Sequence, residues 1–125
     1  MLSKDTVLEK TKEILADSLD LEEDEIHLES LLFTEFNIES TETLEITFRI
    51  EQEFDFVMAE SEFWNIPGLI ANEGLFDGQF SDEAKKLVDE YFDIPEEKLN
   101  SVESPFDLYN LISVNDLVNY IMKKI

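Results

Sequence analysis

Apolar residues between positions 41 and 55 recur at helical spacing, and they form two stripes. The first stripe consists of Leu44, Thr47, Phe48 and Glu51, and the second of Ile46, Ile50 and Phe54. Such spacing predicts an amphipathic helix of about three to four turns. We expect the second stripe to be buried. Leu44 and Phe48 either complete the core or remain partly exposed beside the start of the helix.

Ser40 lies at the expected start of this helix. We predict that it is the N-cap, because its hydroxyl oxygen can accept a hydrogen bond from an unpaired backbone N–H group. Glu42 in the first turn suits the positive end of the helix dipole. The same N–H groups and dipole favour any negative charge at this place. An exposed serine here is therefore also a suitable anchor for a phosphate ester.

The rest of the pattern predicts further helices and no strands. A first helix is expected over residues 3–18, with an apolar face made of Val7, Leu8, Thr11, Ile14, Leu15 and Ser18. Residues 20–32 form a long connection with regularly placed apolar residues, which favours a segment that runs back between two parallel helices. No part of the chain has strong two-residue alternation, so the sequence predicts an all-α fold.

A long stretch separates the helix at residue 41 from the last helix. Residues 61–64 are expected to open a short helix that Pro67 and Gly68 end, and Gly74 and Gly78 mark turns. The stretch is rich in aromatic residues, namely Phe63, Trp64, Phe76 and Phe80. They either pin it to the bundle or wall a pocket or partner surface. Pinning is favoured, because aromatic residues between elements generally belong to the core.

Four further helical segments are predicted downstream. Ser81 caps a helix with an acidic first turn, and Pro95 opens a single turn that reaches Lys98. Residues 104–111 favour a short helix. Ser113 and Asp116 resemble a capping box, which would begin a last helix near the end of the chain.

Composition restricts the class of protein and its partners. A chain of 125 residues suits one domain, and ten phenylalanines argue against disorder. The net charge of −22 excludes nucleic acid and anionic membranes as natural partners and favours basic patches on other proteins. Without cysteine there is neither a disulfide nor a thiolate metal site. No signal peptide or membrane-spanning run is apparent, so we expect a cytoplasmic protein.

The chain offers little for catalysis. It has one histidine, His27, in a polar connection, and it lacks cysteine and a Gly-x-Ser-x-Gly motif. Three glycines supply no phosphate-cradling loop, and no acidic run has the glycine of a calcium loop. We therefore expect no enzyme, no catalytic residue and no dedicated metal site.

The residues around Ser40 resemble an acyl carrier protein, a small acidic helical bundle that carries acyl thioesters on a 4′-phosphopantetheine arm. The family's motif, usually Asp-Ser-Leu after a glycine, corresponds to Asn-Ile-Glu-Ser-Thr at residues 37–41. The likeness runs without a gap from residue 19 to residue 55. It implies that Ser40 carries the arm. It also implies a four-helix bundle with an extra helical insertion, roughly 57–107, between the second and last helices of a single domain, 1–125.

The resemblance also implies partners and a docking face. A phosphopantetheinyl transferase would supply the arm from coenzyme A, and an acyl-carrier synthetase, ketosynthase or acyltransferase with basic patches would use the monomeric carrier in fatty acid or other lipid biosynthesis. The implied docking residues are Glu39, Glu42, Leu44, Glu45, Phe48 and Glu51. The acids among them either only solvate the helix or form the electrostatic part of this face.

Three departures from the family's motif suggest a specialised member. Asn37 replaces the usual glycine, Glu39 replaces the aspartate and Thr41 replaces the leucine after the serine. The segment that begins at Glu62 is similar to the acyl carriers of very-long-chain groups of lipid A. These features favour a specialised lipid, lipopolysaccharide or polyketide pathway. The alternative is an unmodified acidic interaction module that has lost its prosthetic group.

Overall fold

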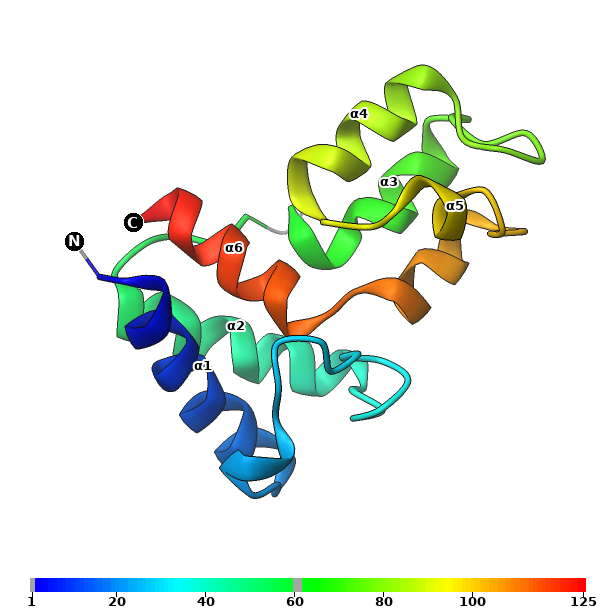
Figure 1. Cartoon of the computed structure of the whole chain (residues 1–125). Helices are drawn as coiled ribbons and strands as arrows, with labels where there is room; N and C mark the ends of the chain where they lie inside the picture. Colours follow the sequence, from blue (N-terminus) through cyan, green and yellow to red (C-terminus); the bar gives the residue numbers. More distant parts are fainter. Residues whose placement is uncertain (1, 60–61) are drawn as a thin grey trace.

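The computed structural model describes residues 2–59 and 62–125, and helices joined by long connections account for its architecture (Figure 1). The α-helices are α1 (Lys4–Leu19), α2 (Ser40–Phe54), α3 (Ile66–Asn72), α4 (Asp82–Tyr91), α5 (Glu96–Leu99) and α6 (Val114–Lys124). Three 3-10 helices are η1 (Glu23–Glu25), η2 (Phe63–Asn65) and η3 (Pro105–Leu111). Within the described ranges no strand forms, and strand-like pairing is limited to the isolated bridges Leu31–Ser113 and Phe76–Phe80. The prediction of an all-α fold is confirmed.

Helices α1, α2 and α6 pack together as the first part of the core (Figure 1). The second apolar stripe of α2 is buried as predicted, and it consists of Ile46, Ile50 and Phe54. Two ion pairs join α1 to α2: Lys10 Nζ lies 2.5 Å from Glu53 Oε1, and Arg49 pairs with Asp17. Because the earlier residue of α1 pairs with the later residue of α2, the two helices are antiparallel. The prediction of two parallel helices was wrong.

The long connection between α1 and α2 has a different role from the one predicted. It crosses the start of α6, whose backbone N–H groups have no partners within their own helix. Val114 N donates to Ser30 O at 2.9 Å, and Asn115 N donates to Leu28 O at 2.8 Å. These hydrogen bonds explain the length of the connection, because it must reach the first turn of α6 before returning to α2.

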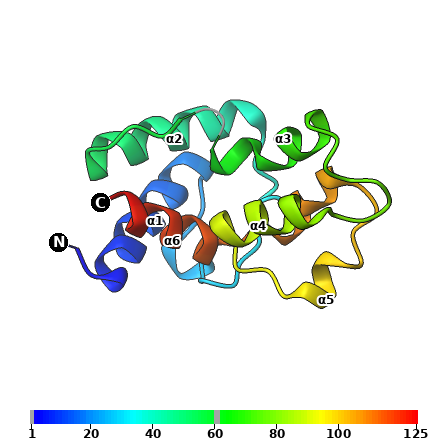
Figure 2. The same cartoon turned by 90° about the horizontal axis from the view of Figure 1, so that it is seen from above.

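Helices α3, α4, α5 and η3 form a second group beyond one end of the first (Figure 2). One continuous cluster of buried apolar residues runs through both groups. Phe63 is fully buried where the groups meet, and its ring lies 5.4 Å from those of Phe92 in the α4–α5 connection and Tyr120 in α6. Phe80 is also buried. Phe63 thus pins the insertion to the bundle, as the sequence favoured, whereas Phe80 packs against Phe76 within the insertion.

Several predicted helix ends need correction in this region. Pro67 and Gly68 do not end a helix but lie in the first turn of α3, where a proline removes no hydrogen bond because its N–H would be unpaired anyway. The predicted start at residue 61 lies outside the described residues, and Phe63 begins η2. The short helix predicted over residues 104–111 is confirmed, and it is the 3-10 helix η3.

Other predicted ends are confirmed. Ser81 Oγ accepts a hydrogen bond from Ala84 N at 3.1 Å at the start of α4. Ser113 and Asp116 form the expected capping box of α6. Asp116 also accepts a hydrogen bond from Asp93 N at 2.7 Å, so this cap holds the end of the α4 segment as well. The sequence pattern therefore located the N-caps of α4 and α6 correctly, whereas it placed a helix end wrongly at Pro67 and Gly68.

A charged cluster ties the segment before α3 to α6. Tyr120 Oη donates to the Glu62 carboxylate, and Lys124 Nζ lies 3.1 Å from Glu62 Oε1. The hydrogen bond from Tyr120, helped by Lys124, holds the pKa of Glu62 below its ordinary value of 4.5. The pKa of Glu62 is thus lower in the folded chain than in the unfolded one. Its contribution to stability is present above the ordinary carboxyl pKa and is lost as pH falls through the lowered pKa.

Replacing Glu62 by glutamine should therefore destabilise the protein in a pH-dependent way. At pH 7 we expect the free energy of unfolding to fall by about 1 to 2 kcal/mol, because a hydrogen bond and an ion pair to a carboxylate are lost. The difference from the wild type should shrink as pH falls below 4.5. Urea unfolding at a series of pH values measures it. The exposed Glu73→Gln variant is the control, and a difference that is constant with pH would contradict the assignment.

Candidate functional site

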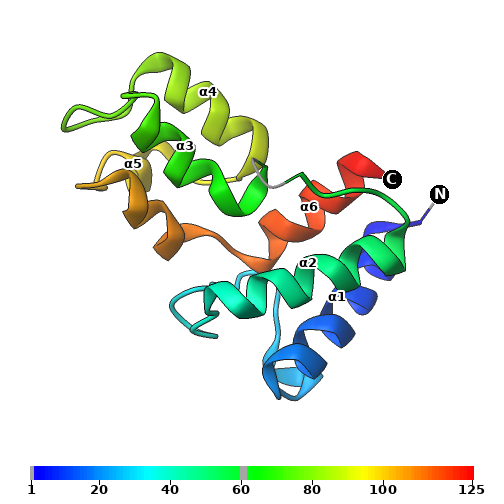
Figure 3. The same cartoon turned by 180° about the vertical axis from the view of Figure 1, so that it is seen from behind.

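Figure 3 shows α2 and the connection that leads into it. Ser40 is the first helical residue of α2, and it is exposed. The predicted N-cap was one residue off, because the N-cap is Glu39. Glu39 N donates to Glu42 Oε1 at 2.9 Å, and Glu39 O accepts the N–H groups of the first turn. The helix start is thus fixed by two glutamates and not by the serine. The Ser40 hydroxyl remains on the surface near the positive end of the helix dipole.

Asn37 turns the chain into this helix. Its φ of 55° lies in the left-handed region, which strongly favours glycine but which asparagine tolerates better than most residues. The family's motif, as described above, usually has glycine at this position. The departure at Asn37 therefore preserves the backbone conformation that leads to Ser40.

Four of the six proposed docking residues are exposed at the start of α2 or along it, and Glu42 and Glu51 are half-buried. The side chains of Leu44 and Phe48 are 70% and 60% exposed, so they do not complete the core. Glu39 and Glu45 are exposed beside them. Two large apolar side chains flanked by carboxylates form a surface that suits a partner with apolar and basic groups.

Glu51 differs from the other acids of that set. It is half-buried, and its Oε2 accepts a hydrogen bond from Met58 N at 2.8 Å. The carboxylate thereby fixes the chain as it leaves α2. Glu45 Oε1 lies 3.6 Å from Arg49, so part of its charge is balanced within the helix. The acids nearest Ser40 in sequence, Glu39 and Glu42, instead organise the start of α2.

A cavity of about 520 Å³ opens beside Ser40. One side comes from α2, and the other comes from the insertion and from the connection before α2. The lining residues are Phe33, Ser40, Thr43, Leu44, Thr47, Met58, Ala59, Trp64, Asn65 and Tyr109. None of these described residues is charged. In a chain with 31 acidic residues, a lining that is uncharged in its described part favours an uncharged ligand.

Hydrogen bonds and ring contacts fix the wall opposite α2. Trp64 Nε1 donates to Thr47 Oγ1 at 2.7 Å, and Tyr109 Oη donates to Trp64 O at 2.8 Å. The ring of Phe33 meets those of Trp64 and Tyr109 edge to face, at centroid distances of 6.0 and 4.9 Å. Burial raises the pKa of the Tyr109 phenol, so it remains a donor at neutral pH.

Sequence reasoning found only part of this site. It singled out Ser40, Leu44 and Trp64, although pinning was favoured for Trp64 over a pocket wall. Thr43 and Thr47 were missed as cavity residues, yet their spacing of three and seven residues from Ser40 puts them on one helical face. Tyr109 was missed without any signal, because only the tertiary fold brings η3 to α2.

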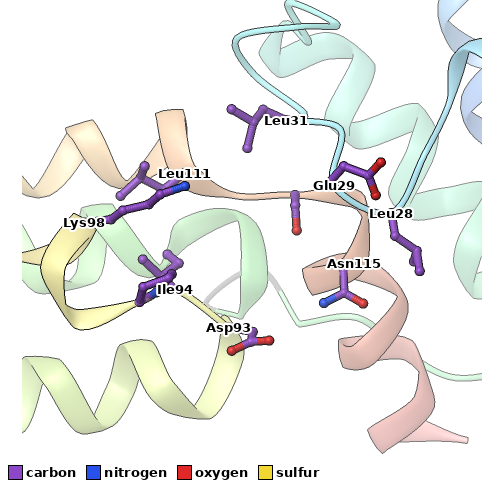
Figure 4. Close-up of a pocket in the computed structure, with 10 residues that line it drawn as sticks. Leu28, Glu29, Leu31, Asp93, Ile94, Lys98, Leu111 and Asn115 are labelled. Atoms are coloured by element: carbon purple, nitrogen blue, oxygen red, sulfur yellow. The ribbon is translucent and has the colours of Figure 1, made fainter.

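A second cavity, of about 430 Å³, lies away from Ser40 between the α1–α2 connection and the α4–α5 segment (Figure 4). Leu31, Ile94 and Leu111 supply its apolar part, and Glu29 and Lys98 carry opposite charges at its edge. The start of α6 beside it is already paired with the connection's carbonyl groups. The second cavity therefore offers no free helix N-terminus to an anion.

The described ranges, 2–59 and 62–125, contain no group of three or more potential metal ligands. His27 is exposed in the α1–α2 connection. No helix there has the length and apolar character needed to cross a bilayer.

Comparison with known proteins gives one consistent family. The family model described as "Phosphopantetheine attachment site" matches residues 9–71, from α1 into α3. An acyl carrier protein of Petrotoga mobilis is 32% identical over 65 residues, which are 52% of this chain and 76% of the relative. The acyl carrier protein of Clostridium acetobutylicum is 36% identical over 56 residues, 45% of this chain and 73% of the relative.

A third relative extends the same result. The acyl carrier protein of Coprothermobacter proteolyticus is 28% identical over 65 residues, 52% of this chain and 79% of the relative. No solved structure gives a significant match. The family model covers half of the chain, and the relatives are matched over most of their own length. The chain therefore belongs to the acyl carrier protein family, as a carrier with covalently attached 4′-phosphopantetheine and not as an enzyme.

Proposed function

We propose that Ser40 is the attachment residue and that the protein delivers acyl thioesters to enzymes of a specialised lipid, lipopolysaccharide or polyketide pathway. The observation that carries the proposal is an exposed serine hydroxyl at the first turn of α2, within the range of the family match. Its neighbours suit a phosphodiester, because first-turn N–H groups and the helix dipole favour negative charge.

The surroundings of Ser40 also leave room for a tethered group. The hydroxyl lies at the edge of the 520 Å³ cavity, and the helix cap does not depend on it. Esterification of the oxygen would therefore cost the fold no hydrogen bond of the cap. When bound, the arm supplies the terminal thiol that carries the acyl group. The protein supplies the attachment point, the helix start that holds it and the surface that partners recognise.

The specialised pathway is supported by the insertion and by Thr41. The insertion and the end of η3 together add to α2 a cavity wall that reaches Tyr109, which lies beyond the range of the family match. Thr41 is exposed next to Ser40, where a modifying enzyme would contact it. Both features favour a dedicated set of partners. Within this proposal the chain is one domain, 1–125, located in the cytoplasm and active as a monomer.

Peptide mapping tests the attachment directly. The protein would be incubated with coenzyme A, Mg²⁺ and a broad-specificity phosphopantetheinyl transferase, digested and analysed by mass spectrometry. We expect one added arm per chain, on the peptide that contains Ser40. An arm on another peptide would contradict the assignment of the residue while leaving the family unchanged.

The docking face predicts a separate kinetic result. Replacing Phe48 by alanine should raise the KM of the transferase for this carrier about five- to tenfold, because an exposed aromatic anchor is lost. Initial rates of arm transfer at varied carrier concentration measure it. Val57→Ala is the matched control, because Val57 is 81% exposed just after the opposite end of α2. Equal effects of both substitutions would show that docking does not use the Phe48 face.

A further inference from the structure

Hydrogen bonds tie the backbone on both sides of Ser40. Before the serine, Glu39 N donates to Glu42 Oε1 at 2.9 Å. After it, the carbonyl oxygen of Ser40 accepts a hydrogen bond from Thr43 Oγ1 at 2.6 Å. Glu39 O also accepts the N–H groups of Glu42 and Thr43, both at 3.0 Å. Because the backbone sets the direction of the Cα–Cβ bond, these hydrogen bonds fix where the Ser40 hydroxyl leaves the helix.

The carboxylate of Glu42 is used within the chain. Glu42 is half-buried, and its Oε1 is the acceptor of the Glu39 amide. Glu45, three residues later, is exposed, and its carboxylate lies 3.6 Å from the Arg49 guanidinium. The hydrogen bond that Glu42 makes requires an oxygen acceptor but no negative charge, since glutamine serves at this position of a capping box as well as glutamate. The two acids therefore differ in what each contributes.

We propose that Glu42 is a positioning residue for transfer of the arm and not a docking residue. This inference rests on attachment of the arm at Ser40. In the transfer, Ser40 Oγ forms a bond to the phosphorus of coenzyme A that bears the pantetheine, adenosine 3′,5′-bisphosphate leaves, and the hydroxyl proton passes to a base of the transferase. A misplacement of about 1 Å can slow such a step roughly a hundredfold. Glu42 holds the turn that carries the attacking oxygen.

Two substitutions at this one position separate the hydrogen bond from the charge. Glu42→Gln removes the charge and keeps an oxygen acceptor of the same reach, whereas Glu42→Ala removes both. Loading from coenzyme A and Mg²⁺ would be followed by quenched flow and intact mass, with a broad-specificity transferase in excess at varied concentration. We expect Glu42→Ala to lower the maximal single-turnover rate about tenfold, with the half-saturating concentration changed by less than about twofold. Glu42→Gln should keep both values within about twofold of the wild type.

Glu45 supplies the comparison, because its exposed carboxylate can act on a partner only through charge. Glu45→Gln and Glu45→Ala should raise the half-saturating concentration to the same extent, and added salt should reduce the effect. Hydrogen exchange of the Glu39 amide gives a second readout for Glu42. It should become about tenfold faster in Glu42→Ala, because the amide loses its acceptor, and remain unchanged in Glu42→Gln.

The outcomes distinguish this inference from the proposed function. Equal increases of the half-saturating concentration in Glu42→Gln and Glu42→Ala would overturn it and make Glu42 a docking acid. Unchanged kinetics in Glu42→Ala would also overturn it. Circular dichroism identifies a variant that has lost its fold, and in that case Glu42→Gln decides alone through its half-saturating concentration. Attachment at Ser40 stands in all of these cases, whereas an arm on another residue would overturn both the proposed function and the inference.

Discussion

Replacing Ser40 by alanine is expected to abolish the mass gain that a phosphopantetheinyl transferase produces, while the fold remains intact. Loading requires the hydroxyl oxygen as nucleophile, and alanine has none. Stability should change by less than about 0.5 kcal/mol, because the N-cap of α2 is Glu39 and the serine is exposed. Had Ser40 been the cap, as the sequence suggested, the expected cost would be about 1 kcal/mol.

The experiment needs controls that test the position and not only the residue type. Thr41→Ala and Thr43→Ala each remove a hydroxyl within three residues of Ser40, and both variants should still be loaded. Intact mass spectrometry before and after incubation gives the result, and urea unfolding gives the stability. Loading of the Ser40→Ala variant would refute the assignment. No loading of the wild type by several transferases would favour the alternative, an unmodified acidic interaction module.

Replacing Phe63 by alanine is expected to destabilise the protein by about 3 to 5 kcal/mol, the range for a fully buried aromatic side chain. Phe63 lies where the insertion meets the bundle, and its ring contacts those of Trp64, Phe92 and Tyr120. Removal of the ring leaves a cavity that joins both parts of the core. Since a typical domain has about 5 to 15 kcal/mol of stability, this substitution would remove a large share of it.

Phe48→Ala provides a matched comparison, because the same substitution is made on a side chain that is 60% exposed. It should change stability by no more than about 0.5 kcal/mol. Urea unfolding of both variants at one ionic strength measures the difference, because salt screens the repulsion within a chain of net charge −22. A loss below about 1 kcal/mol in Phe63→Ala would show that the insertion is not held through this ring.

The sequence predicted features that depend on nearby residues. The buried stripe of α2, the caps at Ser81 and Ser113 and the exposure of Ser40 all follow from spacing or from local hydrogen bonds. The misplaced N-cap at Ser40 also has a local cause. The Glu42 carboxylate accepts a hydrogen bond from the backbone N–H of Glu39, and this makes Glu39 the N-cap instead of Ser40.

Features that depend on distant segments could not be predicted in this way. The antiparallel direction of α1 and α2 is shown by ion pairs between residues more than thirty positions apart, which sequence spacing does not encode. The helix that includes Pro67 forms because α3 packs against η3, a contact that sequence spacing does not encode. The cavity wall at Tyr109 likewise requires the complete fold, since 45 residues separate it from Trp64.

The order in which this protein matures follows from that arrangement. The proposed attachment residue, Ser40, needs only its own helix and a glutamate pair three residues apart, whereas the cavity beside it needs segments spread from Phe33 to Tyr109. Short-range structure forms earlier than structure that closes long loops. We therefore expect Ser40 of a newly made chain to become accessible to a modifying enzyme before the cavity beside it has formed. An acyl group can be sheltered there only after the distant segments have packed together.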